Sequence, residues 1–570
     1  MADAVSADGP DFPVSPAEWL AGGSGGADRL ARLLPAALRG MAAGTAERGG
    51  PVPAGGPAAV AAALARVEPS AVLAAPLSGE APVAASSRVS GSETSAAALS
   101  RATAPETSAA VAAGRSRVAA PEPPVPANSP VWPKGAEPHR PSGDSLPQHG
   151  IGAERALEEL STLLAAGSAD PADPACAAHL HCPPLAVSVV ADLVASALNP
   201  SMDSWDQAPV ASEIERQFTS GIARLCYPDA ARPDAVVTSG GTEANLLGLL
   251  LARESGVTRP VCGANSHHSV ARAAWLLGLP APVVVPCADD RMVPSALAEA
   301  LAPLGAQAVV VATAGTTNTG RIDPLPEIAE ICRRTGARLH VDAAYGGLAL
   351  CSETLRRRVA GLELADSVAL DLHKFGWQPV AAGLFAARGG ADLQALTVRA
   401  EYLNADDDTE AGLPDLLGRS LRTSRRPDAF RMAVTVRALG VSGLGALVER
   451  CCANASGVHE LVEAHPALRS WGAPELSTVV FRPLAADELP GLAGDDLVAQ
   501  VRRTLLEDGT AVVGRGALPT GPEGASQLWL KLTLLHPHTS PADYRAVLDA
   551  VAAVATELRA NVARESPVAS

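Results

Sequence analysis

The sequence predicts an α/β fold in which helices cover both faces of a mostly parallel sheet. After residue 151, apolar segments of strand length alternate with segments of helical period. Most of the expected strands are continuously apolar, as in a sheet that is buried on both faces. Polar residues gather just after several of these strands, and open parallel sheets bind their ligands at that edge. With 570 residues, 47% of them hydrophobic, the chain can bury a large core.

Residues 1–150 are dominated by Ala, Pro, Gly and Ser, and we expect them to form a long disordered tail. Short alanine-rich pieces such as residues 27–34 could be transient helices or docking segments. The N-terminus has neither the basic start nor the apolar core of a secretory signal. The nine cysteines are scattered, as is usual for reduced thiols. A cytoplasmic location is therefore expected.

The folded part is expected to comprise three regions. Residues 151–215 form a helical segment, because residues 154–164 have helical spacing. Residues 216–430 form the large domain, whose expected strands are residues 235–238, 282–285, 308–313, 337–341, 367–371 and 383–386. Residues 431–565 form a smaller α+β domain, with a helix near residues 436–450 and a strand near residues 528–535.

The charge of the chain favours a small-molecule partner. A formal net charge of -16 argues against a nucleic-acid backbone or an anionic membrane as the main partner. No metal centre is expected, because no C-x-x-C or H-E-x-x-H spacing occurs. Metal binding by His179 with His181, or by His267 with His268, is the less favoured alternative.

Lysine is rare in this chain, so each lysine is informative. Lysine occurs only at positions 134, 374 and 531, although the chain has 45 lysines and arginines together. Lys374 follows the apolar segment 367–371 closely, at the edge where ligands gather. A lysine, unlike an arginine, can lose its proton and act as a nucleophile. Chemistry is the favoured explanation for this amine, and a lysine that caps a strand by chance is the alternative.

Two polar clusters after expected strands indicate a phosphate site and a site for a flat ring. Residues 238–245 contain Gly241 and Thr242 at the start of a helix, where free amides and a hydroxyl suit a phosphate. An ordinary strand-to-helix turn is the alternative. Asp342 ends another apolar segment, and its carboxylate could pair with a protonated ring nitrogen, bind a metal or cap a helix. The small Ala344 leaves space for a ring and favours the first option.

Two further clusters lie between these. Residues 313–317 place hydroxyls, including that of Thr316, after a strand. Residues 266–270 contain His267, whose imidazole could stack on a flat cofactor or simply complete a loop. A phosphate-binding turn, a stacking imidazole, a carboxylate for a ring nitrogen and a lysine thus follow one another along the chain.

In this order and spacing, the motifs resemble those of the group II pyridoxal-phosphate-dependent amino-acid decarboxylases, from about residue 154 to the C-terminus. The resemblance implies the large and small domains of a fold type I enzyme, pyridoxal 5'-phosphate as cofactor, and a homodimer. It implies that Lys374 binds the cofactor covalently, that His267 stacks on its ring and that Asp342 keeps the ring nitrogen protonated. The other cofactor contacts that it implies are Gly241, Thr242, Thr316 near the Asp342 end, Ala344, His373, and Thr423 with Ser424 at the partner's phosphate.

The resemblance also suggests a substrate. Residues 199–215 and 529–539 look most like the diaminobutyrate and siderophore-type lysine decarboxylases, which implies a basic aliphatic substrate such as 2,4-diaminobutyrate or lysine. Asp203 or Asp206 could receive its distal ammonium group, although both could equally be surface or helix-capping acids. Lys531 stands where the family usually offers an arginine to the substrate carboxylate.

Other activities stay open at this point. In the family, a mobile loop often supplies a tyrosine as proton donor, but residues 404–420 contain none and Tyr402 only borders them. A changed donor could lead to an aldehyde product. The alternatives are decarboxylation of valine, leucine, glutamate, aspartate or an aromatic amino acid, an aminotransferase or aldehyde-forming enzyme on the same scaffold, and a binding protein without catalysis.

Overall fold

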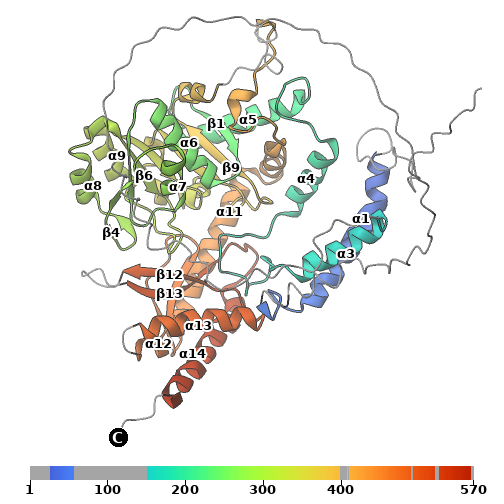
Figure 1. Ribbon diagram of the computed structural model, residues 1–570, viewed down its shortest axis with the longest axis vertical. Helices are drawn as coiled ribbons and strands as arrows, with labels where there is room; N and C mark the ends of the chain where they lie inside the picture. Colours follow the sequence, from blue (N-terminus) through green and yellow to red (C-terminus); the bar gives the residue numbers. More distant parts are fainter. Residues whose placement is uncertain are drawn as a thin grey trace, which may run out of the picture. The chain divides into compact units, whose positions relative to one another are not determined.

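The computed structural model describes residues 26–56, 59, 150–397, 407, 410–489, 492–519 and 526–565. These residues form one large sheet with its helices, a smaller sheet with its own helices, and a helical pair near the N-terminus (Figure 1). The large sheet carries the candidate site.

The large sheet has seven strands in the order β1-β9-β8-β7-β6-β2-β3. Its strands are β1 (Asp234–Thr238), β2 (Arg259–Gly263), β3 (Val283–Val285), β6 (Ala308–Thr313), β7 (Arg338–Asp342), β8 (Ser367–Asp371) and β9 (Gly383–Ala387). Strand β9 runs antiparallel to both of its neighbours, and the other pairs are parallel. The expected mostly parallel sheet is confirmed, and β2 is a strand that the sequence pattern did not indicate.

The strands are apolar on both faces because both faces are covered. Adjacent residues Val236 and Val237 of β1 enter two different hydrophobic clusters, since neighbouring side chains point to opposite faces of a strand. The helices of this domain are α5 (Pro209–Cys226), α6 (Gly241–Glu254), α7 (Ser269–Leu276), α8 (Pro294–Leu301) and α9 (Leu325–Thr335). A short hairpin of β4 (Cys287–Ala288) and β5 (Arg291–Met292) follows β3.

The smaller sheet is antiparallel, with the order β10-β11-β13-β12. Its elements are β10 (Leu468–Ser470), β11 (Thr478–Pro483), α12 (Leu484–Asp487), α13 (Ala493–Glu507), β12 (Gly514–Pro519), β13 (Ser526–Thr533) and α14 (Arg545–Glu565). Helix α11 (Asp428–Ala464) leads into this domain. Within the described ranges, α11 is long and apolar enough to cross a membrane, but it packs against α4 (Ala186–Leu198), α5 and β10 as a core helix does.

Near the N-terminus, α1 (Gly26–Arg48) packs along α3 (Ala153–Ala166). A Cβ atom at Gly44 would lie 2.1 Å from the Thr162 carbonyl oxygen, so glycine allows the two helices to approach closely. The Arg48 guanidinium donates to the Ala165 carbonyl at 2.8 Å and contacts the Asp170 carboxylate at 2.7 Å. The expectation of a disordered tail therefore needs correction for residues 26–56, and its remainder lies almost wholly outside the described residues.

Candidate active site

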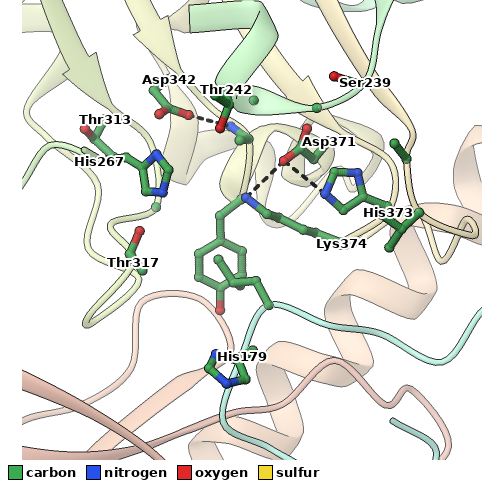
Figure 2. A pocket seen from close by; sticks show the side chains of 18 of the residues that line it. His179, Ser239, Thr242, His267, Thr313, Thr317, Asp342, Asp371, His373 and Lys374 are labelled. Carbon is green, nitrogen blue, oxygen red and sulfur yellow. Dashed lines mark hydrogen bonds and ion pairs between the residues drawn. The ribbon is translucent and has the colours of Figure 1, made fainter. Parts of the chain in front are cut away.

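A cavity of about 510 Å³ opens at the carboxyl ends of β1, β6, β7 and β8 (Figure 2). Eight residues for which the sequence predicts a role with the cofactor or substrate line it: Gly241, Thr242, His267, Asp342, Ala344, His373, Lys374 and Lys531. Seven of them, up to 133 positions apart in the sequence (374 − 241), are brought together at one edge of the large sheet, and Lys531 comes from the smaller sheet.

Lys374 lies just after β8, and its ammonium contacts a buried carboxylate. The Nζ atom lies 3.0 Å from Oδ2 of Asp371, whose side chain is 3% exposed. The other carboxylate oxygen of Asp371 is buried and has no hydrogen-bond partner among the described residues. His373 Nε2 lies 3.5 Å from the same Oδ2 atom. We did not single out Asp371, although it ends an apolar strand just as Asp342 does.

The turn between β1 and α6 forms the rim of the cavity. Helix α6 begins at Gly241, and a Cβ atom there would lie 2.8 Å from the Cβ atom of Ala344. Glycine therefore lets the first amides of α6 approach the end of β7. Ser239 and Thr242 place their hydroxyls at the same rim. Free amides and hydroxyls at a helix start are the groups that bind a phosphate.

Asp342 is held by a buried hydrogen-bond network. Asn245 Nδ2 donates to Asp342 Oδ2 at 2.7 Å, and the Ala344 amide donates to Oδ1 at 3.1 Å. The Asn245 amide oxygen lies 2.9 Å from Nε2 of His340, and His340 Nδ1 lies 2.9 Å from the Ser367 hydroxyl. Burial lowers the pKa of His340 to about 4. The neutral ring therefore donates through Nε2 and accepts from the serine through Nδ1.

The same asparagine also orients His267. Asn245 Nδ2 donates to the Ser269 hydroxyl at 2.9 Å, and that hydroxyl lies 2.8 Å from Nδ1 of His267. Burial, and then the neighbouring His268, lower the pKa of His267. A neutral imidazole at the cavity wall suits stacking on a flat ring. Asn245 thus positions both the stacking residue and the acid, a role that its place at the start of a helix did not reveal.

Lys531 on β13 enters the cavity from the smaller domain. Its ammonium donates to the Thr317 carbonyl oxygen, and the residue is 8% exposed. Burial lowers the pKa of Lys531 to about 8, and the charge of Asp290 opposes this effect. Tyr345, also in the cavity wall, contacts the smaller domain through its hydroxyl, 2.9 Å from the Ser477 hydroxyl.

The structure places five expected residues outside the cavity wall of this chain. The Thr316 hydroxyl donates to Asp290 at 2.6 Å, so the expected support of Asp342 by Thr316 is wrong. Asp203 accepts a hydrogen bond from Gln207, and the Ser424 hydroxyl lies 3.4 Å from Asp203. Asp206 and Thr423 are exposed. The role of Thr423 and Ser424 at a partner's phosphate stays a prediction, and Tyr402 lies outside the described residues.

The fold and this site define an enzyme that binds pyridoxal 5'-phosphate through a lysine. The cavity supplies an amine for the aldehyde, an acid for the ring nitrogen, an imidazole for the ring face and a helix start for the phosphate. Two further features fit a bound polar group. Asp371 Oδ1 has no hydrogen-bond partner among the described residues, and Gly241 has no side chain to fill the space at the rim.

Comparison with known proteins gives the same answer. Residues 138–483 match the family model of the pyridoxal-dependent decarboxylase conserved domain. The chain is 37% identical over 436 residues to L-2,4-diaminobutyrate decarboxylase of Rhizobium meliloti (strain 1021), covering 74% of this chain and 86% of that protein. It is 33% identical over 400 residues to the Acinetobacter baumannii enzyme of the same name, covering 64% of this chain and 78% of that protein.

A solved structure agrees with these sequence matches. The glutamate decarboxylase domain of diaminobutyrate-pyruvate transaminase and L-2,4-diaminobutyrate decarboxylase from Vibrio parahaemolyticus has a TM-score of 0.62 and 28% identity. The match covers 72% of this chain and 87% of that chain. The chain belongs to the pyridoxal-dependent decarboxylase family and is a carboxy-lyase that acts on an amino acid.

Pyridoxal phosphate, when bound, supplies a ring that withdraws the electron pair left behind by the departing carboxylate. The residues of the chain prepare that site. With the cofactor bound, Asp342 would hold a proton at the ring nitrogen, and His267 would cover a ring face. Lys374 would provide the amine for the cofactor aldehyde, and Asp371 is placed to receive the ammonium of Lys374 whenever that amine is free.

Proposed function

We propose that this enzyme decarboxylates L-2,4-diaminobutyrate. The observation that carries the proposal is the 37% identity to a diaminobutyrate decarboxylase over 86% of that protein's length. A second relative of the same name, at 33% identity, supports it. The enzyme is expected to act in the cytoplasm.

Within the cavity, Lys531 is the group proposed to bind the substrate carboxylate. It is a buried cation on β13 of the smaller domain, and it lines the same cavity as Lys374. A compact ammonium binds a carboxylate as a point charge, without the two-pronged geometry of arginine. His179 also lines the cavity, and burial, followed by the charge of Lys531, lowers its pKa.

The distal ammonium of a diamino acid needs an acid, and we propose that Asp203 of a second copy supplies it. Asp203 lies beside Ser424, the residue for which the family resemblance implies contact with the partner's phosphate. A dimer that brings Ser424 to the partner's cavity would bring Asp203 with it. Exposed apolar residues on the neighbouring α4, such as Val190 and Leu198, support a protein interface there.

A substrate panel tests the proposed reaction. The purified enzyme with pyridoxal phosphate is incubated with diaminobutyrate, lysine, valine, leucine, glutamate, aspartate and aromatic amino acids. Carbon dioxide and amine are measured by mass spectrometry. We expect 1,3-diaminopropane from diaminobutyrate with the highest kcat/KM. An acidic amino acid as the best substrate would contradict the proposal and would fit the cationic Lys531. An aldehyde product would assign the enzyme to the oxidative alternative.

A mixed dimer tests the role of Asp203. Asp203→Ala is expected to raise KM for diaminobutyrate while leaving the weak turnover of valine and leucine unchanged, and Asp206→Ala is the matched control. Dimers that combine an Asp203→Ala chain with a Lys374→Ala chain have one cavity with both defects and one with neither, if Asp203 acts across the interface. About half of the wild-type activity would then return. An unchanged preference for diamino acids in Asp203→Ala would remove this assignment.

A further inference from the structure

We propose that Asp290 is the positioning residue that keeps Lys531 charged and in place in the cavity. The inference deepens the proposed function, because it rests on the assignment of Lys531 to the substrate carboxylate. Asp290 does not line the Lys374 cavity. It acts through the turn that carries Thr317 and through its charge.

Asp290 has a left-handed backbone conformation and a buried side chain, which is an unusual combination. Asp289 and Asp290 form the turn of the β4–β5 hairpin with φ values of 50° and 55°. Residues other than glycine, asparagine and aspartate rarely adopt this left-handed conformation. Asp290 is nevertheless only 6% exposed. A buried acid at such a position is costly, so its contacts indicate what it does there.

The carboxylate of Asp290 accepts hydrogen bonds from both ends of the turn formed by residues 316–319. Its Oδ2 atom accepts hydrogen bonds from the hydroxyls of Thr316 and Thr319, each at 2.6 Å. The turn is closed by the Gly320 amide, which donates to the Thr316 carbonyl at 2.8 Å. Between the two threonines lies Thr317, whose carbonyl oxygen accepts from the Lys531 ammonium. Asp290 therefore fixes the turn whose carbonyl group holds Lys531.

The charge of Asp290 also matters, because the other neighbours of Lys531 give it no compensation. Burial lowers the pKa of Lys531 to about 8, and Asp290 is the acid that opposes this shift. His179, from the segment before α4, has a pKa lowered by burial and then by Lys531 and Arg502 of α13. The β12 residue paired with Lys531 is Gly514, which has no side chain. Without the carboxylate, none of these neighbours would offset the effect of burial on the Lys531 pKa.

The scarcity of lysine makes the charge of Lys531 directly measurable. Protein labelled with ¹³C at lysine Cε gives signals from only three side chains, and Lys531→Arg identifies the one from Lys531. In the full-length wild-type protein, this signal is expected to titrate near pH 8. In Asp290→Asn the titration should move to lower pH. The matched control is Asp289→Asn, which removes the same charge from the neighbouring turn residue, whose side chain is 55% exposed.

Asp290→Gly guards against a folding failure, because glycine adopts the left-handed conformation without strain. The Lys531 titration should also move to lower pH in this variant. An unchanged titration in either folded Asp290 variant, or an equal shift in Asp289→Asn, would overturn the inference. The titration is measured without substrate, so its result does not depend on which amino acid the enzyme decarboxylates.

Kinetics then connect the charge to catalysis. The alkaline limb of kcat/KM should move to lower pH in Asp290→Asn, with KM at pH 8 raised roughly fivefold if the Lys531 pKa falls by about one, and kcat less affected. Asp290→Glu keeps a carboxylate and should therefore have a pH profile and a KM closer to those of the wild-type enzyme. A loss of kcat without change in KM or in the pH profile would show a purely structural role for Asp290 and contradict the inference.

Discussion

At the scale of single residues, Asn245 connects several residues of the site. Its amide joins Asp342, His340 and Ser269 in one buried network. Replacement by alanine would leave buried polar groups without partners, at a cost of about 1–3 kcal/mol for each one. It would also release His267 and Asp342 from their orientation.

We therefore expect Asn245→Ala to lower kcat by roughly tenfold to a hundredfold, the usual effect of losing an orienting hydrogen-bond partner. Steady-state kinetics at saturating cofactor measures it. Asn454→Ala is the matched control, because Asn454 donates to the Thr539 carbonyl at 2.6 Å in the smaller domain. If both variants lost stability but neither lost kcat, Asn245 would have no role in the site.

His340 gives the fold a pH dependence. Burial lowers the folded-state pKa of His340 to about 4, whereas an unfolded histidine titrates near about 6.5. The unfolded state therefore binds a proton first as the pH falls, and stability is lost between about pH 6.5 and 4. Urea unfolding should show a loss of about 3 kcal/mol across this window. The loss should shrink in His340→Gln, and an equal loss in that variant would assign it to other groups.

The sequence predicted the single residues at strand ends, but it did not predict the buried hydrogen-bond network that orients them. Lys374, Asp342 and His267 stand out because polar groups follow apolar segments. Asn245 and His340 look ordinary in the sequence, since their partners are 95 positions apart. The prediction for Thr316 was wrong for the same reason. A hydroxyl that follows a strand can bind any nearby acid, and the sequence does not show that this acid is Asp290 and not Asp342.

At the scale of elements, the contact of α6 with β7 holds this network in place. A Cβ atom at Gly248 of α6 would lie 2.7 Å from Nδ1 of His340. We expect Gly248→Ala to destabilise the protein by about 1–3 kcal/mol, as overpacking does, and to lower activity. Thermal unfolding and kinetics measure both effects.

Gly221→Ala is the matched control, since Gly221 is an exposed glycine inside α5 and a Cβ atom there meets nothing within 4 Å. This variant should be more stable by about 0.5–1 kcal/mol, because alanine favours a helix. Equal effects of the two substitutions would show that the crossing of α6 and β7 is not tightly packed.

The elements themselves were predicted best where they are buried and apolar. Strands β6 and β8 have the bounds that the sequence indicated, because all of their residues face a core. Strand β2 was missed because Pro260 and a short apolar stretch hide it. Helix α1 was anticipated only as a possible transient helix over residues 27–34, because its sequence contains Pro35 and the helix is stabilised by packing against α3.

At the scale of the whole molecule, we expect a homodimer formed in part by α4. Light scattering should give twice the chain mass of 57.7 kDa. Val190→Glu with Leu198→Glu should produce a monomer with little activity, because charge on an apolar interface opposes association. Leu492→Glu, at a leucine that is 78% exposed in the smaller domain, is the control and should remain dimeric. A fully active monomer would contradict both the dimer and the proposed role of Asp203.

The central claim is that Lys374 is the lysine that binds the aldehyde of pyridoxal phosphate. Borohydride reduction of the loaded enzyme, followed by peptide mass spectrometry, tests it directly, since only three lysines compete for the label. We expect a reduced pyridoxyl group on Lys374 and none on Lys531 or Lys134. A label on either of those lysines, with Lys374 unmodified, would contradict it.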